Sequence, residues 1–137
     1  MQSLYLLFAA AFLVLFLVFG GVWQGVVAVA YPWITPVAFV LGGLAALVSL
    51  VAVFLYRDRA KQRKVVLAAQ WLDVLLVLVI AGGLVALTFG DAGSLGVGAT
   101  SFYLTLLLPI VAYVFLRLAR RGVEKDIALV RSMDRLR

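Results

Sequence analysis

The residues of this chain that could carry chemistry are few, and three of them suggest one arrangement: Gln70, Asp73 and Arg117. Gln70 and Asp73 are one helical turn apart, so they share a face of any helix that contains both. Asp73 lies inside a long apolar stretch, and an Asp at the centre of a membrane helix costs ~2.5–3.5 kcal/mol, so it needs a partner. Arg117 is the candidate donor, with Tyr113 one turn before it. We expect a polar clamp between two helices, with a proton or ion site at Asp73 as the alternative.

No other group of residues defines a reaction. The 137 residues include no cysteine and no histidine, which excludes disulfides, thiolate and imidazole catalysis, and haem or zinc ligation through these side chains. A single carboxylate supplies neither an acid–base pair nor a metal site. The glycine-rich segment 90–98 lacks the Lys and Ser/Thr of a phosphate-binding loop, so we expect a plain turn. The sequence therefore predicts no enzyme activity, no cofactor and no bound metal.

The elements that must hold these residues are long apolar segments. Hydrophobic residues make up 66% of the chain and charged residues 13%, against about 45–50% and about 25% in soluble domains. A bilayer core about 30 Å thick needs about 20 apolar residues per helix. Four segments of this kind fit the sequence, at about 4–22, 37–56, 65–89 and 100–118. We predict an all-α polytopic membrane protein, with an antiparallel bundle of four transmembrane helices as a single domain over 1–137.

The basic residues predict the orientation. All twelve Lys and Arg lie in two groups, seven in 117–137 and five in the short segment 57–64, which we expect to be a loop: Arg57, Arg59, Lys61, Arg63 and Lys64. Lys and Arg favour the cytoplasmic side of a membrane. We therefore expect this loop and both termini in the cytoplasm. The same rule accounts for the net charge of +6, so we expect no nucleic-acid partner.

Three glycine pairs fall in the predicted helices, at 20–21, 42–43 and 82–83. Small residues let helix backbones approach closely in lipid, where packing replaces the hydrophobic effect as the driving force. We expect these pairs to mark close packing inside one bundle. Dimerisation through one of these faces is the alternative.

The tail 119–137 predicts a short amphipathic cytoplasmic helix. An apolar stripe recurs at spacings of four, three, three and three residues: Val123, Ile127, Val130, Met133 and Leu136. We expect Val130, Met133 and Leu136 to face a protein surface, either the chain's own basic loop or a separate subunit. The end Asp134-Arg135-Leu136-Arg137 would supply the rim of that contact, with Arg135 and Arg137 outermost. A helix lying on the membrane surface is the alternative.

Several segments carry a resemblance to a known family: Lys125-Asp126, Leu129-Val130-Arg131-Ser132 and Asp134-Arg135-Leu136-Arg137 at the end, Gln2-Ser3-Leu4-Tyr5-Leu6-Leu7 at the start, and Arg59 to Leu72 in the middle. In these segments, and in a short polar residue just inside the third apolar segment, the chain resembles a bacterial family of small four-span inner-membrane proteins with a domain of unknown function. The resemblance covers the whole chain. It implies the four-helix topology and no activity.

These observations favour a non-enzymatic accessory or scaffold subunit of a bacterial inner-membrane complex. The expected partners are the lipid bilayer and either other membrane subunits or further copies of the chain, contacted through the basic loop and the tail. A small transporter or channel that uses Asp73 is the alternative. A transport pathway needs polar groups through the depth of the membrane, and here they are sparse.

Overall fold

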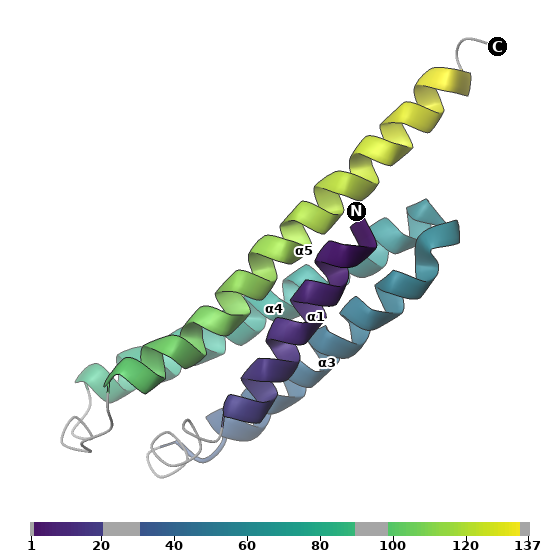
Figure 1. Cartoon of the computed structure of the whole chain (residues 1–137). Coiled ribbons are helices and arrows are strands. Elements are labelled where there is room, and N and C mark those ends of the chain that lie inside the picture. Colours follow the sequence, from purple (N-terminus) through teal and green to yellow (C-terminus); the bar gives the residue numbers. More distant parts are fainter. Residues whose placement is uncertain (1, 21–30, 90–98, 135–137) are drawn as a thin grey trace.

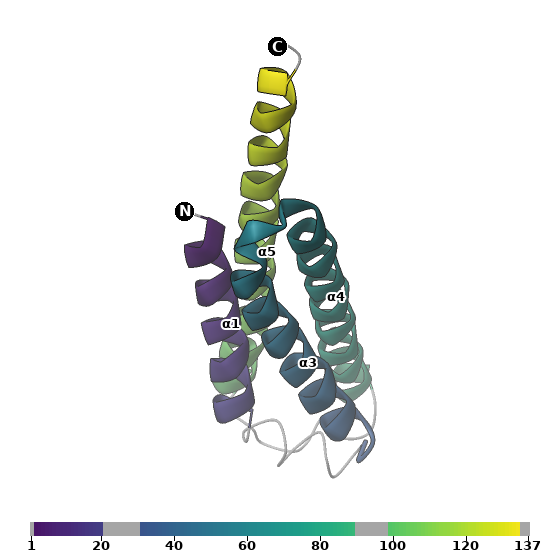
Figure 2. The same ribbon diagram turned by 90° about the vertical axis from the view of Figure 1, so that its right-hand side faces the viewer.

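The computed structural model describes residues 2–20, 31–89 and 99–134, with side chains for 3–20, 31–86 and 106–133 (Figure 1). Over these residues the fold is all-α and contains no strand. The elements are α1 (Gln2–Phe19), α3 (Ile34–Phe54), the 3-10 helix η1 (Leu55–Arg57), α4 (Arg59–Phe89) and α5 (Ala99–Asp134). Successive α-helices run antiparallel, and each contacts two neighbours in the order α1, α3, α4, α5 and back to α1 (Figures 1 and 2). The predicted all-α fold with four helices is confirmed for the described residues.

Apolar side chains fill the inside of the bundle in two clusters along its axis. One is nearer to the start of α1: Leu6, Ala9, Ala52, Val66, Ala69, Leu116 and Ala119. The other is nearer to the opposite end: Leu13, Phe16, Ile34, Ala38, Ala45, Ala46, Leu76, Ile80 and Ala112. Many of these side chains are alanines, which lets the helix backbones approach closely.

The glycine pairs differ in their surroundings. A Cβ added to Gly42 would lie 3.3 Å from side-chain carbons of Phe16 and Leu17, so α1 and α3 are close-packed at this point. A Cβ added to Gly43 or Gly82 would meet nothing within 4 Å. The close packing predicted from the glycine pairs is therefore confirmed at Gly42, while Gly43 and Gly82 leave open space.

The outward faces of α3 and α4 are as apolar as the interior. Large side chains recur every seven residues on each helix and are 55–78% exposed: Val40, Leu47 and Phe54 on α3, and Trp71, Leu78 and Val85 on α4. By length and composition, the helical segments Ile34–Arg57 and Arg59–Ala86 are each able to cross a membrane. The described part of α1 adds a shorter apolar helix, Ser3–Phe19.

The predicted loop at 57–64 is mostly helical. Only Asp58 interrupts the helices, because η1 ends at Arg57 and α4 begins at Arg59. The Asp58 carboxylate accepts a 3.1 Å hydrogen bond from the backbone N–H of Lys61, which caps the first turn of α4. Four of the five basic residues predicted to lie in a loop, all except Arg57, therefore belong to α4, which continues into the bundle.

The start of α3 also differs from the prediction. This helix begins at Ile34 rather than after Pro36. Pro36 fits there because the first turn of a helix has backbone N–H groups without partners, so the missing donor costs nothing.

The tail is not a separate helix. A single α-helix, α5, spans 36 residues and is therefore about 54 Å long; its last turns project beyond the bundle (Figures 1 and 2). Gly122 does not end it, although glycine inside a helix costs about 1 kcal/mol. The buried Val123 follows this glycine directly, and an ion pair between Arg120 and Glu124 spans it. The predictions for Arg135, Leu136 and Arg137, and for the side chain of Asp134, lie outside the described residues.

Candidate functional site

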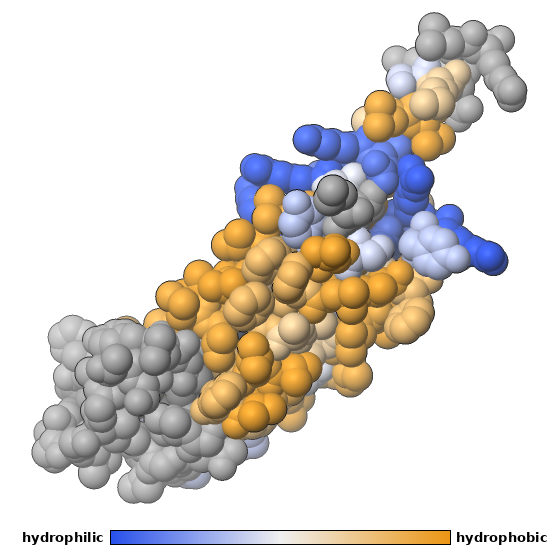
Figure 3. Space-filling view, in the orientation of Figure 1, coloured by the Kyte–Doolittle hydropathy of each residue, from blue (hydrophilic) through white to orange (hydrophobic). Residues whose placement is uncertain are grey.

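Charged side chains gather at one end of the bundle. At this end α1 begins, η1 is followed by α4, and α5 extends beyond the other helices (Figure 1). We name this region the charged end and define it as residues 57–64 and 117–126. In the space-filling view it forms a band of hydrophilic residues between the apolar body and the projecting part of α5 (Figure 3). The charged end contains all five basic residues of the predicted loop.

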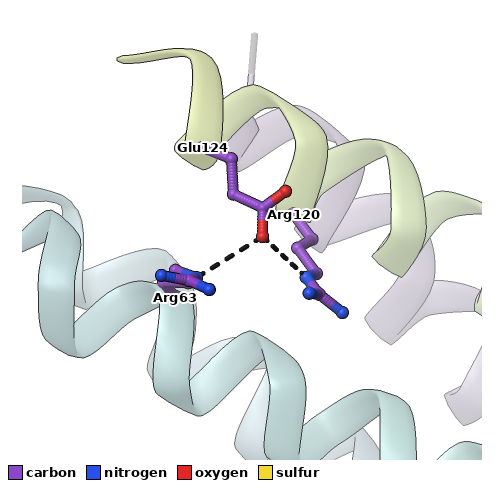
Figure 4. A network of polar contacts seen from close by, with 3 residues as sticks. All are labelled: Arg63, Arg120 and Glu124. Carbon is purple, nitrogen blue, oxygen red and sulfur yellow. Dashed lines mark hydrogen bonds and ion pairs between the residues drawn. The ribbon is translucent and has the colours of Figure 1, made fainter. Parts of the chain in front are cut away.

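The centre of the charged end is Glu124 on α5. Its carboxylate lies 2.9 Å from Nε of Arg120 on the same helix and 3.4 Å from Nε of Arg63 on α4 (Figure 4). The hydrogen bond from Arg120, helped by the charge of Arg63, holds the pKa of Glu124 below its ordinary value. All three side chains are partly exposed, so each pair contributes only a fraction of a kcal/mol up to about 1 kcal/mol. Their role is to set how α4 and α5 lie against each other.

A second ion pair lies beside the first. Arg59 is one turn before Arg63 on α4, and its guanidinium lies 3.7 Å from the Asp126 carboxylate and 3.5 Å from the Asp126 backbone oxygen. Two ion pairs therefore join the first turns of α4 to α5. Sequence reasoning named the basic residues but not Glu124 or Asp126 as their partners, because the two segments are far apart in the chain.

The remaining basic residues of the predicted loop have other surroundings. Lys61 pairs with Asp58 at 3.0 Å, and the hydrogen bonds from Lys61 lower the pKa of that carboxyl. The Arg57 guanidinium lies over the Tyr56 ring, 6.0 Å from its centroid. Lys64 is exposed and has no acidic partner among the described residues.

Gln62 is the one side chain of this segment that points inward. It is 2% exposed, and its amide donates a 3.0 Å hydrogen bond to the backbone oxygen of Ala52. Ala52 lies in the last turn of α3, where carbonyl groups have no partner within the helix. Gln62 therefore joins the end of α3 to the start of α4. In the sequence, Gln62 lies within the segment Arg59 to Leu72 that carries the family resemblance, and nothing in that segment predicts this hydrogen bond.

The predicted clamp between Asp73 and Arg117 is wrong. Asp73 is fully buried, as expected, but no donor among the described residues reaches either of its carboxylate oxygens. Arg117 is exposed, because it follows the core residue Leu116 and each residue turns the helix by about 100°. Gln70 is buried on the same face as Asp73, so only that part of the prediction is confirmed.

Asp73 lies at the level between the two apolar clusters. Ala69 before it and Leu76 after it belong to different clusters. On α3, the buried Ser49 is satisfied within its own helix, where its hydroxyl donates to the Ala45 backbone oxygen at 2.7 Å. The arrangement leaves a carboxyl group inside the bundle that could hold a proton or a small cation.

The tail does not fold onto the chain's own basic segment. Val130 is 47% exposed and Met133 is 66% exposed. The alternative in which these two residues dock on the basic loop is therefore wrong, since ion pairs hold that segment further down α5. Contact with a separate subunit stays a prediction.

The fold and the charged end define a class: an all-α four-helix protein with two helices apolar enough to cross a membrane and a basic end held together by ion pairs. A family model described as a domain of unknown function, DUF4293, matches residues 1–136. The chain belongs to this family. No curated protein and no solved structure matches the chain.

Proposed function

We propose that the chain is a four-span protein of the bacterial inner membrane and serves as a non-enzymatic accessory or scaffold subunit of a membrane complex. The observation that carries this proposal is the shape of α5. Its inner part packs in the bundle, and its last turns stand clear of it with exposed apolar side chains such as Val130 and Met133. Such a projection suits contact with another protein.

The membrane placement is supported by the outer surface. Exposed apolar side chains at seven-residue intervals on α3 and α4 suit lipid, because water would favour polar residues there. The 18 residues of α1 span about 27 Å, close to the ~30 Å of a hydrocarbon core. The described start of the chain lies at the charged end, and its described end projects beyond the bundle on the same side (Figure 1). The positive-inside rule favours the cytoplasm for this side.

Thiol labelling tests this topology. Ala60→Cys lies in the charged end and Pro32→Cys at the opposite end, and both positions are exposed. A membrane-impermeant maleimide added to intact cells should label Pro32→Cys and leave Ala60→Cys unlabelled until the cells are opened. The reverse pattern would overturn the orientation.

Recovery from native membranes tests the subunit role. The tagged chain, extracted in mild detergent at its natural expression level, should bring down another membrane protein in a fixed ratio. Recovery as a monomer or as a homo-oligomer alone would refute the proposal.

A second candidate is a small transporter or channel, and the specific observation that favours it is Asp73. A buried carboxyl without a donor is costly and is commonly functional in membrane helices. In liposomes, the purified chain should then carry protons or Na⁺ down a gradient, and Asp73→Asn should abolish the flux while Arg117→Gln leaves it unchanged. Absence of flux from the unaltered chain would refute this candidate.

A further inference from the structure

The apolar stripe on the projecting part of α5 continues the face that packs inside the bundle. Buried residues on this face are spaced four, three and four apart: Ala112, Leu116, Ala119 and Val123. Ile127 and Val130 follow at spacings of four and three, and Met133 comes three residues later. At about 100° per residue these side chains stay on the same side of the helix. The stripe therefore faces across the charged end of the bundle and not away from it.

Together, the stripe and the charged end form a corner. Its wall is the stripe Ile127, Val130 and Met133, on the part of α5 that projects beyond the bundle (Figures 1 and 3). Its floor is the end of the bundle at η1 and the first turns of α4. We name this region the docking corner.

The docking corner has an excess of positive charge. Residues 57–64 and 127–133, which form its floor and wall, hold six Lys/Arg and one acidic residue, Asp58. Asp58 pairs with Lys61, while Arg59 and Arg63 pair with Asp126 and Glu124 of α5. In the described part of the chain, no ion pair joins the other three cations of the corner to an acidic group: Arg57, Lys64 and Arg131.

This charge selects among the possible occupants of the stripe. A second copy of the chain would bring the same basic end, and like charges at close range oppose association. A lipid surface would meet the apolar body and the band of cations, whereas α5 projects beyond that band and away from the body. An amphipathic occupant could place its apolar face against the stripe that forms the wall. Its acidic face could then pair with the cations of the floor.

We propose that the docking corner binds an acidic amphipathic helix from another protein. Its apolar side chains would cover Val130 and Met133, and its carboxylates would pair with cations of the floor such as Arg57 and Lys64. This inference rests on the proposed subunit function and names the chemistry of the partner.

The size of the corner predicts the character of the contact. The part of α5 after Glu124 is ten residues long, or about 15 Å, which provides an interface smaller than the ~1,200 Å² of stable complexes. Charge attraction must then supply much of the affinity and of the association rate. Binding should weaken steeply with salt, because the screening length falls from about 10 Å at 0.1 M to about 3 Å at 1 M.

The first test uses designed peptides and the whole chain in nanodiscs of neutral phosphatidylcholine. A fluorescent Leu/Glu amphipathic helix should bind, while a Leu/Lys helix and a Leu/Glu peptide scrambled to remove its apolar face should not. Val130→Glu should weaken binding at least about ten-fold, which corresponds to 1.4 kcal/mol. Ala128→Glu is the matched control, because it adds the same charge to an exposed position on the opposite side of α5 and should change binding less than three-fold.

Three results would overturn the docking corner. The first is equal binding of the Leu/Lys and Leu/Glu helices, or equal loss in Val130→Glu and Ala128→Glu. The second is a dimer of the chain that Val130→Glu disrupts and the Leu/Glu helix displaces, which would make a second copy the occupant. The third is binding of anionic vesicles that depends on Val130, which would make lipid the occupant.

A photo-crosslinker in native membranes separates this inference from the proposed function. Placed at position 130, it should attach to an acidic amphipathic segment of the co-purified partner, as identified by mass spectrometry, and placed at position 128 it should not. A partner recovered in a fixed ratio but crosslinked at neither position would leave the subunit function standing and refute the docking corner. Failure to recover any partner would refute the function itself.

Discussion

Replacing Asp73 with alanine should stabilise the bundle. The carboxylate is fully buried and no described donor reaches it, so its removal recovers the ~1–3 kcal/mol cost of an unsatisfied buried polar group. Alanine also has the higher helix propensity, by up to about 0.7 kcal/mol. The void left behind costs about 1 kcal/mol. The net expectation for Asp73→Ala is a gain of up to about 2.7 kcal/mol.

The sign of this change distinguishes the observed arrangement from a clamp. If Asp73 paired with Arg117 inside the bundle, removal of one partner would cost about 3–5 kcal/mol. Reversible unfolding in mixed micelles, followed by circular dichroism, measures the difference. Arg117→Ala is the control, and it should stay within about 0.5 kcal/mol of the unaltered chain because its side chain is exposed and forms no ion pair among the described residues.

The reasoning fails if Asp73→Ala destabilises the bundle by more than about 2 kcal/mol. A double-mutant cycle would then show whether Arg117 is the missing partner, because coupled residues give non-additive changes. If Asp73 serves transport, alanine should raise stability while abolishing flux, since functional sites often retain groups that destabilise the fold.

Three further predictions concern the packing and the charged end. Gly42→Leu should destabilise the contact between α1 and α3 by about 1–3 kcal/mol through overpacking, while Gly43→Leu should be nearly neutral because the added side chain meets open space; thermal unfolding measures both. Gln62→Leu should cost about 1–3 kcal/mol by leaving a buried carbonyl without its donor, and Gln62→Glu, which cannot donate when ionised, should not restore it. Because the pKa of Glu124 is lowered by its arginines, the ion pairs should persist above its ordinary value of 4.5 and be lost as pH falls through the lowered pKa; hydrogen-exchange protection factors at the start of α4, taken relative to the intrinsic rate at each pH, should fall there, and Glu124→Gln should remove that fall.

The helices could be predicted because each apolar segment is long enough to form one, whatever its neighbours are. The run of charge at residues 57–64 predicts a loop, and this prediction is wrong because all of these residues except Asp58 are helical. Arg, Lys and Gln are good helix formers, and Asp58 is a suitable N-cap three residues before Lys61. Both of these local signals favour a helix, and a run of charge between two apolar segments does not by itself mark a turn.

The partners of the polar residues could not be predicted, because they depend on how the helices are aligned against each other. Asp73 and Arg117 both lie at the cytoplasmic side in the predicted topology, yet a rotation of about 100° per residue turns Arg117 outward. The pairing of Arg63 with Glu124 joins residues 61 positions apart. Nothing in either segment alone specifies that they meet.

The continuity of α5 gives the protein a lever. The pair between Arg63 and Glu124 lies about 15 Å from the described tip at Asp134 and about 38 Å from the start at Ala99, at 1.5 Å per residue. A tilt of about 10° around this point would move the tip by about 3 Å and the far end by about 7 Å. A small displacement of the tip would thus be enlarged more than two-fold at the opposite end of a straight helix. Pro109 lies inside the longer arm and is the point at which that arm can bend, because proline removes a backbone hydrogen bond there.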